Sequence, residues 1–405
     1  LAIWFFRFFA VQIIFYGMGL VFTGVLNAYR HFVAPAVAPI FNNLVVTATL
    51  LGFYVPFRES DPSLALTGLA VGTTLGVVVM AAVQLPTLAR LGIRYTPRID
   101  WRHPGLMAVG VKMVPILVYV VTNLFAVTVR TNVAVATAEG GQAALRYAWQ
   151  FYQLPYGIFA VSLATAIFPE LAERANARDM PAFRAMFARG MRGTIVLMLP
   201  LSALLVALAT PVITLYRAGR FTAEDVPVVA GVLAWWAAGL LFFAVQQYLL
   251  KSFYSLQDAL TPTYLNIGAT ALHVSLYVLL ARGIGSWSGL GIIGIPIADG
   301  IYFLLFAAVM FAVLRRRVGT LEGRSLAATG LKAAAGSAVG AAIAHVAMLV
   351  TGGLAEFSGG FIIQLAIAGV LGLVAAYGVM AALGTPELAG FVERISSRIS
   401  RRSRP

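Results

Sequence analysis

Long apolar stretches alternate with short polar gaps along almost the whole chain. Most of the stretches are about twenty residues or more, the length that an α-helix needs to cross the hydrocarbon core of a bilayer. Membrane-spanning barrel strands are about half as long, so helices are the elements that fit. The pattern predicts helices over residues 4–27, 36–57, 64–86, 107–135, 143–168, 191–215, 227–250, 263–282, 289–314, 328–351 and 360–383. The expected fold is therefore an all-α polytopic membrane protein.

Composition supports a membrane protein, because 60% of the residues are hydrophobic and only 11% are charged. Soluble domains are far less apolar. The formal net charge of +14 would suggest nucleic acid in a soluble protein, but here we expect it to orient the chain in the membrane. The chain contains no cysteine, which excludes disulfides and thiolate metal sites. Its histidines also lack ligand spacing, so the sequence predicts neither a metal nor a cofactor.

Lysine and arginine fall mainly in alternate gaps between the predicted helices. The odd-numbered gaps and the C-terminal tail hold most of the 29 basic residues, among them Arg30, Arg90, Arg94, Arg174, Arg178, Arg315, Arg316 and Arg317. The N-terminal end and the other gaps hold only Arg7, Arg58, Arg217, Arg220 and Arg282. Because basic loops stay in the cytoplasm, we expect a cytoplasmic C-terminus and residue 1 on the opposite side.

Two short patterns recur in the first and second halves of the chain. A proline followed four residues later by asparagine occurs at 39–43 and at 262–266. The run Phe-Phe-Ala-Val-Gln occurs at 8–12 and at 242–246. Weak internal symmetry is typical of transporters built from two lobes. If the first predicted helix corresponds to the seventh, lobes of six helices would place three more helices before Leu1, and we expect Leu1 to be a cut point.

Two arginines lie within or beside predicted membrane helices, where an unshielded cation is costly. Arg130 lies well inside the fourth predicted helix, on the same face as Asn123. On the fifth, the spacing of four and three residues places Arg146, Gln150 and Gln153 in one stripe. Together these side chains would form a basic, amide-rich wall that suits phosphate oxygens. Alternatively, both arginines extend to a nearby membrane surface.

The fifth predicted helix also contains a candidate hinge. Pro155 interrupts this helix, and Gly157 follows two residues later. Proline frees a backbone carbonyl and permits bending, so these two residues would allow the helix to flex. The alternative is that the helix tolerates the proline without moving.

Acidic residues argue against enzyme chemistry in the membrane. Of the 15 aspartates and glutamates, only Asp299 lies inside an apolar segment, whereas Asp258 lies at a helix end. No pair of carboxylates could hold Mg²⁺ within the predicted helices. Asp299 could relay a proton or bind a cation, but we expect it to be capped or paired by its neighbours.

Small residues at helical spacing indicate packing rather than chemistry. The run Gly336-Ser337-Ala338-Val339-Gly340 places two glycines on one helix face, the pattern with which membrane helices approach closely. The run at 289–294 matches the glycine spacing of a dinucleotide-binding fingerprint but not its structural context. It begins an apolar helix instead of following a strand, so that function is rejected.

A series of short motifs resembles the MurJ/MviN family of lipid II flippases. They occur in the family's order over about residues 5–270, and the hydropathy pattern continues the match to the C-terminus. Each motif is modest alone, and together they are specific. The motifs are Leu26-Asn27-Ala28 with Phe32, Pro35, Pro39 and Asn43, Gln84-Leu85-Pro86, Pro97-Arg98-Ile99, Leu154-Pro155-Tyr156-Gly157, Phe168-Pro169-Glu170-Leu171, Gly219-Arg220-Phe221-Thr222, and Phe253-Tyr254-Ser255 with Asp258, Thr261 and Pro262.

The resemblance implies a fourteen-helix, two-lobed fold of the multidrug/oligosaccharidyl-lipid/polysaccharide exporter superfamily, of which about eleven helices are present. Residues 1–86 would be the C-terminal part of the first lobe, 107–318 the second lobe, 328–384 an extra helix pair and 385–405 a basic cytoplasmic tail. The implied activity moves undecaprenyl-pyrophosphate-linked peptidoglycan precursor, lipid II, across the bacterial inner membrane by alternating access. The implied partners are this anionic lipid, the bilayer and proteins of cell-wall synthesis.

The chain departs from the family pattern at its charged residues. The family's cavity arginines lie mostly on the first two helices, which precede the part matched here. Another family arginine lies on the eighth helix five residues before the proline, and this chain has Gln150 there. Arg146, one turn earlier, is the candidate substitute for that charge.

Three alternatives to a lipid II flippase remain open from the sequence. A drug exporter or another polysaccharide-lipid exporter of the same superfamily would share the fold, but a cation exporter should carry more buried carboxylates than Asp299. A membrane transferase acting on polyprenyl phosphates would need paired acidic residues beside a cytoplasmic loop, and Glu170 with Glu173 is the closest approach. A truncated chain could also be a scaffold without transport activity.

Overall fold

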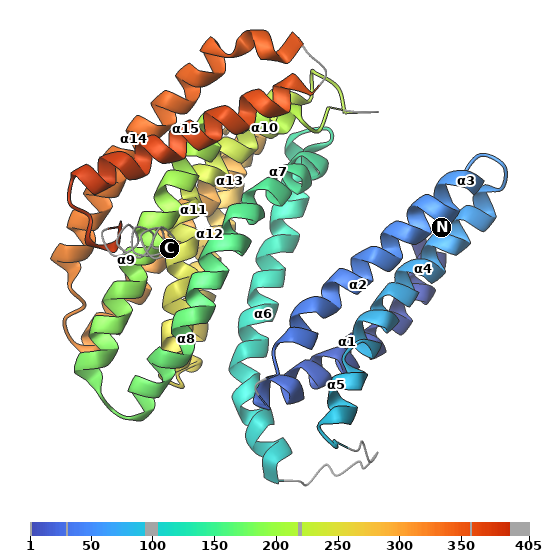
Figure 1. The fold of residues 1–405 in the computed structure, drawn as a ribbon, viewed down its shortest axis with the longest axis horizontal. Coiled ribbons are helices and arrows are strands. Elements are labelled where there is room, and N and C mark those ends of the chain that lie inside the picture. Colours follow the sequence, from blue (N-terminus) through green and yellow to red (C-terminus); the bar gives the residue numbers. More distant parts are fainter. Residues whose placement is uncertain (1, 30, 94–103, 218–220, 357–358, 389–405) are drawn as a thin grey trace, which may run out of the picture. The chain divides into compact units, whose positions relative to one another are not determined.

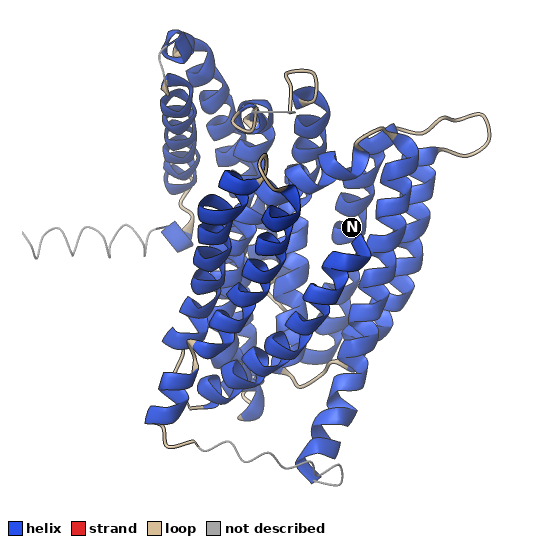
Figure 2. Ribbon diagram, turned by 90° about the vertical axis from the view of Figure 1, so that its right-hand side faces the viewer, coloured by secondary structure: helices blue, strands red, loops and turns tan. Residues whose placement is uncertain are grey.

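The computed structural model describes residues 2–29, 31–93, 104–217, 221–356 and 359–388. Contacts within the chain divide it into two compact units, Leu1–Trp101 and Arg102–Pro405. The described segments are helices joined by loops, apart from one isolated bridge between Ile284 and Trp287 (Figures 1 and 2). Each unit is a bundle of helices.

Eleven helices in the described part of the chain are long and apolar enough to cross a membrane, which confirms the predicted number. Each overlaps its predicted range. The spans are Ile3–Ala28, Val33–Phe57, Pro62–Arg90, Met113–Thr137, Gly141–Asn176, Met180–Ala207, Val226–Ser255, Leu260–Arg282, Gly291–Val318, Gly323–Val350 and Gly360–Ala382.

The sixth span was predicted at 191–215, and both ends were wrong. The helix begins at Met180, where the Asp179 side chain accepts the backbone N–H of Ala182 at 3.1 Å and Pro181 lies in the first turn. Both features are favourable at a helix start. The first turns also carry arginines, so the apolar pattern alone placed the start too late. The helix ends at Ala207, before a short helix at Ala209–Thr214.

Unit 1 is a set of three long helices in which the third packs against the other two. Glycines on the third helix allow close approach: a Cβ at Gly72 would lie 2.1 Å from Thr49, and one at Gly76 would lie 2.4 Å from Asn42. The helices are α1 (Ala2–Ala28), α2 (Val33–Thr49), which continues through a π-helical turn into α3 (Val55–Phe57), and α4 (Pro62–Ala82), followed by the short α5 (Leu85–Arg90).

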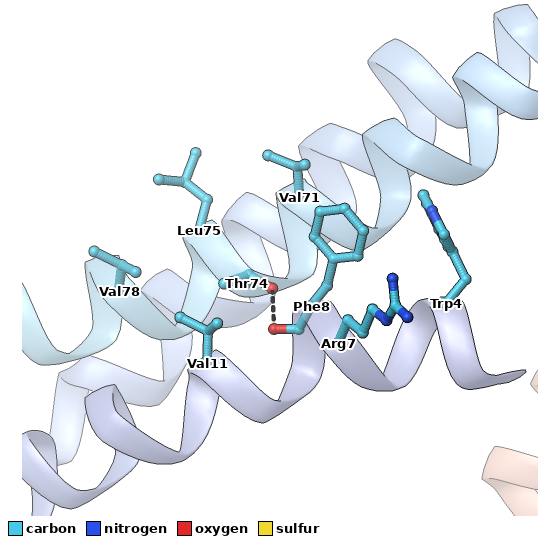
Figure 3. Close-up of a pocket in the computed structure, with 8 residues that line it drawn as sticks. All are labelled: Trp4, Arg7, Phe8, Val11, Val71, Thr74, Leu75 and Val78. Atoms are coloured by element: carbon cyan, nitrogen blue, oxygen red, sulfur yellow. Dashed lines mark hydrogen bonds between the residues drawn. The ribbon is translucent and has the colours of Figure 1, made fainter.

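A groove of about 630 Å³ runs between α1 and α4 in unit 1 (Figure 3). Gln12 Nε2 donates to Thr74 Oγ1 at 3.1 Å and joins the two helices. None of the site residues predicted from the sequence lines this groove. Its lining consists of Trp4, Arg7, Phe8, Val11, Val71, Thr74, Leu75 and Val78.

Unit 2 is a larger bundle with α11 at its centre. This helix buries Trp236 and Tyr248 and contributes to both main apolar clusters of the unit. Burial of such large side chains supplies much of the free energy of packing. The described helices are α6 (Pro104–Thr137), α7 (Gly141–Pro155), α8 (Val161–Asn176), α9 (Met180–Ala207), α10 (Ala209–Thr214), α11 (Val226–Ser255), α12 (Leu260–Tyr277), α13 (Gly294–Val318), α14 (Gly323–Val350) and α15 (Gly360–Ala382).

The sequence repeat corresponds to similar packing in the two units. In unit 1, α4 packs against both α1 and α2, and in unit 2, α13 packs against both α11 and α12. The repeated Phe-Phe-Ala-Val-Gln run lies on α1 and α11, and the repeated Pro-to-Asn motif lies on α2 and α12. The recurring motifs therefore mark helices with the same neighbours in each unit.

Helices α14 and α15 pack tightly against each other through small residues, which confirms the packing role expected for the glycines of α14. A Cβ at Gly340 would lie 2.4 Å from the Gly372 carbonyl oxygen, and one at Gly336 would lie 2.5 Å from the Ala376 carbonyl oxygen. At the N-terminal end of α14, Arg192 Nη1 donates to Glu322 at 2.6 Å and its Nε donates to Glu387 at 2.5 Å. This arginine of α9 connects both ends of the helix pair to the bundle.

We predict that Gly340→Ala destabilises the protein, because the new methyl group meets backbone atoms that cannot rotate away. Overpacking of this kind costs about 1–3 kcal/mol. The matched control is Gly330→Ala on the same helix, where a Cβ would meet nothing within 4 Å and better helix propensity should add up to about 1 kcal/mol. Thermal unfolding in detergent measures both changes. Equal effects of the two substitutions would contradict the packing role.

Asp258 precedes the first turn of α12 and binds two groups there. It accepts the backbone N–H of Thr261 at 3.0 Å, and Arg317 at the end of α13 donates to it. Burial disfavours the ionised form, but the hydrogen bonds from Thr261 and the guanidinium of Arg317 outweigh it and hold the pKa of Asp258 below its usual range. The ionised carboxylate thus connects the ends of two helices.

We predict that Asp258→Ala lowers stability at pH 7 by about 1 kcal/mol, the usual cost of a lost cap. Because the pKa of Asp258 is lower in the folded than in the unfolded state, its stabilising effect is present above the unfolded pKa of about 4. That effect is lost as the pH falls through the folded pKa. Unfolding at pH 7 and at pH 3 should therefore show a smaller difference between parent and variant at pH 3. A difference that grows at acid pH would exclude this role for the carboxylate.

Candidate functional site

Helix α7 has one buried and one exposed face, and the predicted polar stripe lies on the exposed face. Arg146, Gln150 and Gln153 are exposed, whereas Ala148 and Tyr152 are buried in the bundle. This is the arrangement that helical periodicity produces when one stripe packs against a core. The apolar contacts of the buried face therefore fix the direction in which the three polar side chains point.

A tight turn positions α7 beside α6. Gly140 has φ +71°, a left-handed conformation that favours glycine, and a Cβ at Gly141 would lie 2.4 Å from the Ala134 carbonyl oxygen. This close approach requires glycine and brings the start of α7 against the end of α6. The turn that the sequence indicated by two glycines thus sets the distance between the two helices.

Aromatic residues surround the polar stripe on α7. Tyr216, which follows α10, donates its hydroxyl to Gln150 Oε1 at 2.8 Å. Its ring also lies 5.7 Å from Tyr147 and 5.1 Å from Phe151, measured between centroids. Among the described residues, no carboxylate lies within ion-pair distance of Arg146. Arg146 therefore has no acidic partner in the described part of the protein, and the neighbouring Gln150 is held by a hydrogen bond from Tyr216.

Arg130 points into unit 2 rather than along the exposed face of α7. Its guanidinium carbon lies 5.4 Å from the ring centroid of Trp149 and 5.8 Å from that of Trp236. Its Nη1 lies 4.0 Å from Asp299 Oδ2, and its side chain is 20% exposed. Cation–π contacts and a nearby carboxylate offset the cost of placing this charge among apolar helices. Among the described residues, no hydrogen bond joins Arg130 to Arg146, Gln150 or Gln153.

Asp299 is the centre of a buried hydrogen-bond network that draws on three helices besides its own. Its side chain is 2% exposed. Trp236 Nε1 donates to Oδ2 at 2.6 Å, His273 Nε2 lies 2.7 Å from Oδ1, and the Tyr277 hydroxyl donates to Oδ1. This confirms the expectation that Asp299 is paired. The hydrogen-bond donors to Asp299 belong to α11 and α12, and the nearby cation, Arg130, belongs to α6.

Sequence reasoning missed His273 and Tyr277 as partners of Asp299. A signal was available on α12, where four polar residues recur at helical spacing and are all buried. They are Asn266, Thr270, His273 and Tyr277. A polar stripe on an otherwise apolar helix predicts a polar partner on a neighbouring helix. Only the fold shows that this partner is Asp299.

Asn123 and the candidate hinge have local surroundings of their own. Asn123 Nδ2 donates to the Tyr119 carbonyl oxygen at 2.7 Å, one turn earlier on α6. Pro155 ends α7, and a π-helical turn at Tyr156–Ala160 follows before α8 begins at Val161. Such wide turns often occur at functional positions in helices. A Cβ at Gly157 would meet no atom within 4 Å, so this side of the turn is open.

Metal-ligating groups are sparse in the described part of the chain. No group of three His, Cys, Asp or Glu side chains there could hold a metal ion. Glu170 lies 4.0 Å from Arg174 on the same helix, a surface ion pair of ordinary kind. The arrangement thus offers cations and amides on helix faces rather than a carboxylate metal site.

Solved structures of similar fold are membrane transporters. A structure described as "Lipid II flippase MurJ, inward closed conformation" aligns with 94% of this chain and 74% of its own at a TM-score of 0.68 and 20% identity. An inward-facing multidrug resistance MATE family transporter of the MOP superfamily aligns with 79% of this chain and 72% of its own, at a TM-score of 0.61 and 16% identity. The chain therefore has the fold of this transporter superfamily.

Sequence comparison identifies the family. The model described as "Lipid II flippase MurJ" matches residues 1–372. A lipid II flippase MurJ of Burkholderia cenocepacia is 30% identical over 311 residues, which are 75% of this chain and 58% of that protein. A probable lipid II flippase MurJ of Vibrio cholerae is 27% identical over 71% of this chain and 53% of that protein. The chain belongs to the lipid II flippase MurJ family and spans little more than half the length of these two relatives.

We predict that Asp299→Ala destabilises the protein by about 3 kcal/mol, because it leaves the charge of Arg130 and three buried donors without their acceptor. Glu224→Ala is the control, since this carboxylate is exposed and its loss should change stability by less than about 0.5 kcal/mol. Thermal unfolding in detergent compares the two. If both variants unfold at the parent's temperature, Asp299 does not hold the network together.

Proposed function

We propose that this protein translocates lipid II, an undecaprenyl-pyrophosphate-linked peptidoglycan precursor, across the membrane as a flippase. The observation that carries the proposal is the exposed stripe of Arg146, Gln150 and Gln153 on a helix that is packed rigidly against the core. Membership of the lipid II flippase MurJ family supports the choice of substrate. The activity is transport, and it requires no cofactor and no covalent chemistry.

The chemistry of the stripe suits the head group of such a lipid. The guanidinium of Arg146 would bind pyrophosphate oxygens through charge-assisted hydrogen bonds. The amides of Gln150 and Gln153 would donate to phosphate or sugar oxygens beside it, and Tyr216 already orients Gln150. In this way Arg146 would supply the charge that the family pattern places one turn later. Arg130 and Asn123 on α6 would extend the polar surface.

Movement would take place by alternating access. In this proposal, residues 1–86 form the C-terminal part of one lobe, 107–318 the second lobe, 328–384 an additional helix pair and 385–405 a basic tail. The π-helical turn after Pro155 would let the second lobe bend at Gly157. A bound head group drives such a change only if it binds the two states with different affinity.

The proposed location is the bacterial inner membrane, with the C-terminus in the cytoplasm. The distribution of lysine and arginine between alternate loops supports this orientation. Lipid II is made at the cytoplasmic leaflet and used outside, so the chain would pass it outward to proteins of cell-wall synthesis. A drug exporter is less well supported, since cationic drugs need a free carboxylate and Asp299 is surrounded by donors.

We predict that the gene, in its complete form, sustains growth of a bacterium depleted of its own lipid II flippase, and that Arg146→Ala combined with Gln150→Ala fails to do so. Removing the charge and the amide should reduce outward exposure of lipid II by at least about tenfold, as expected for loss of a strong phosphate contact. The measurement is extracellular labelling of lipid II in the depleted strain, alongside growth.

The matched control is Arg282→Ala, which removes an exposed arginine outside the stripe and should leave exposure of lipid II unchanged. All variants are compared at equal membrane abundance. Rescue by the double variant would exclude the stripe as the head-group site. Absence of rescue by the abundant parent protein would exclude the proposed function itself.

A further inference from the structure

Arg130 is part of the surface proposed to bind substrate, and it already has an anionic partner, Asp299, inside the protein. Its Nη1 lies 4.0 Å from Asp299 Oδ2, a distance at the limit of an ion pair. The rings of Trp149 and Trp236, which meet edge to face, lie 5.4 and 5.8 Å from the guanidinium carbon, and the side chain keeps 20% of its surface exposed. Arg130 therefore lies at the boundary of the bundle, where Asp299 and an external anion would compete for it.

Asp299 has stronger contacts than the one with Arg130. His273 Nε2 lies 2.7 Å from Oδ1 and Trp236 Nε1 lies 2.6 Å from Oδ2. An ionised carboxylate only accepts hydrogen bonds, so Nε2 of His273 carries the proton when the imidazole is neutral. A second proton, which makes the ring cationic, would bind at Nδ1. Imidazole is the side chain that ordinarily changes charge near neutral pH. The described titratable groups around Asp299 are Arg130 of α6, Tyr152 of α7, His273 and Tyr277 of α12, and Tyr302 of α13.

We propose that His273 is a proton-binding site that controls whether Arg130 is available to an anion. When His273 is neutral, the negative charge of Asp299 is balanced by Arg130. When His273 is protonated, an imidazolium at 2.7 Å balances that charge at shorter range than Arg130 at 4.0 Å. Coulomb energy falls with distance, so the nearer cation replaces the farther one and repels it. Arg130 is then released toward the exposed side of the bundle.

The surroundings of His273 suit a group that gains and loses a proton. Its ring stacks on Tyr302 at 3.9 Å with an interplanar angle of 1°, and the Tyr302 hydroxyl donates to Asn266 Oδ1 at 3.0 Å. Five buried polar atoms among the described residues of unit 2 have no hydrogen-bond partner, and three of them, Tyr152 Oη, Gln246 Oε1 and Asn266 Nδ2, belong to α7, α11 and α12. Unpartnered polar atoms are costly inside a bundle. Among them, the Asn266 amide is connected to His273 through Tyr302, so spare hydrogen-bonding capacity exists in the surroundings of the residue that changes charge.

This inference rests on the proposed function, since it concerns the same anionic substrate. Thermodynamic linkage makes the coupling reciprocal: protonation of His273 should strengthen binding of a pyrophosphate, and a bound pyrophosphate should favour protonation. Substrate and proton would then enter the second lobe together. The site gives the transporter a proton-dependent step that uses a histidine and an internal arginine instead of a free carboxylate.

The test is equilibrium binding of geranyl pyrophosphate, a short soluble prenyl pyrophosphate, to the full chain in lipid nanodiscs at pH 5.5 and pH 7.5. The probe's own ionisation affects every variant equally. The quantity compared between variants is therefore the affinity at pH 5.5 divided by the affinity at pH 7.5. Coupling of ordinary size should make the ratio for the parent at least about fivefold larger than that for His273→Gln. His345→Gln removes an exposed histidine of α14 and should keep the parent's ratio.

Asp299→Asn provides the second arm, because it removes the competing charge but keeps the shape of the side chain. This variant should bind the probe at pH 7.5 more tightly than the parent and lose the additional pH dependence. It also decides the question if His273→Gln fails to give a monodisperse protein. Arg146→Gln should weaken binding at both pH values and keep the parent's ratio.

Two results would overturn the inference alone: a parent-like ratio in His273→Gln, or weaker binding by Asp299→Asn than by the parent at pH 7.5. Absence of binding by the parent at both pH values would overturn this inference together with the proposed function. The outcomes are therefore distinguishable. A ratio that is at least about fivefold larger in the parent and in His345→Gln than in His273→Gln supports the proton-binding site.

Discussion

Much of unit 2 is organised by the need to bury one carboxylate among apolar helices. An ion moved out of water into such surroundings loses several kcal/mol of hydration, and only close donors or cations offset that loss. For Asp299 these come from three neighbouring helices, as Trp236 of α11, His273 and Tyr277 of α12, and Arg130 of α6. Helices that share one acceptor cannot slide independently, so this interaction fixes the register of the bundle more firmly than apolar contacts alone.

The same constraint explains why the two arginines near the start of unit 2 have different surroundings. Arg130 lies on a long helix whose inner face meets aromatic rings and a carboxylate, and its charge is shared with the protein. Arg146 lies on the exposed face of α7, away from the acidic side chains of the described residues. A cation that already has a carboxylate partner binds another anion only when it leaves that partner, whereas a cation without one binds the anion directly. In the proposed function, Arg146 would therefore provide a constant attraction for phosphate and Arg130 a conditional one.

Hydropathy was sufficient to predict the number and approximate position of the membrane helices, because twenty apolar residues are a strong signal in any sequence. It could not locate helix ends that carry charge. The helix at Met180–Ala207 begins with turns rich in arginine, and a single capping contact from Asp179 marks its start. The polar stripe on α7 was also predictable, since helical spacing alone places Arg146, Gln150 and Gln153 together. The contact between His273 and Asp299 joins two helices, and the polar stripe within α12 indicates that a polar partner exists but cannot identify it.

The wide turn at Tyr156–Ala160 affects the whole fifth span. A π-helical turn accommodates one additional residue without completing an additional turn, so every side chain beyond it is rotated by about 100° relative to a continuous α-helix. The surface that begins with Arg146 therefore does not continue in a straight line into α8. Instead, α7 and α8 direct different helix faces toward the same side of the span. One apolar membrane span can in this way present polar side chains on its first half, α7, and pack against neighbouring helices with its second half, α8.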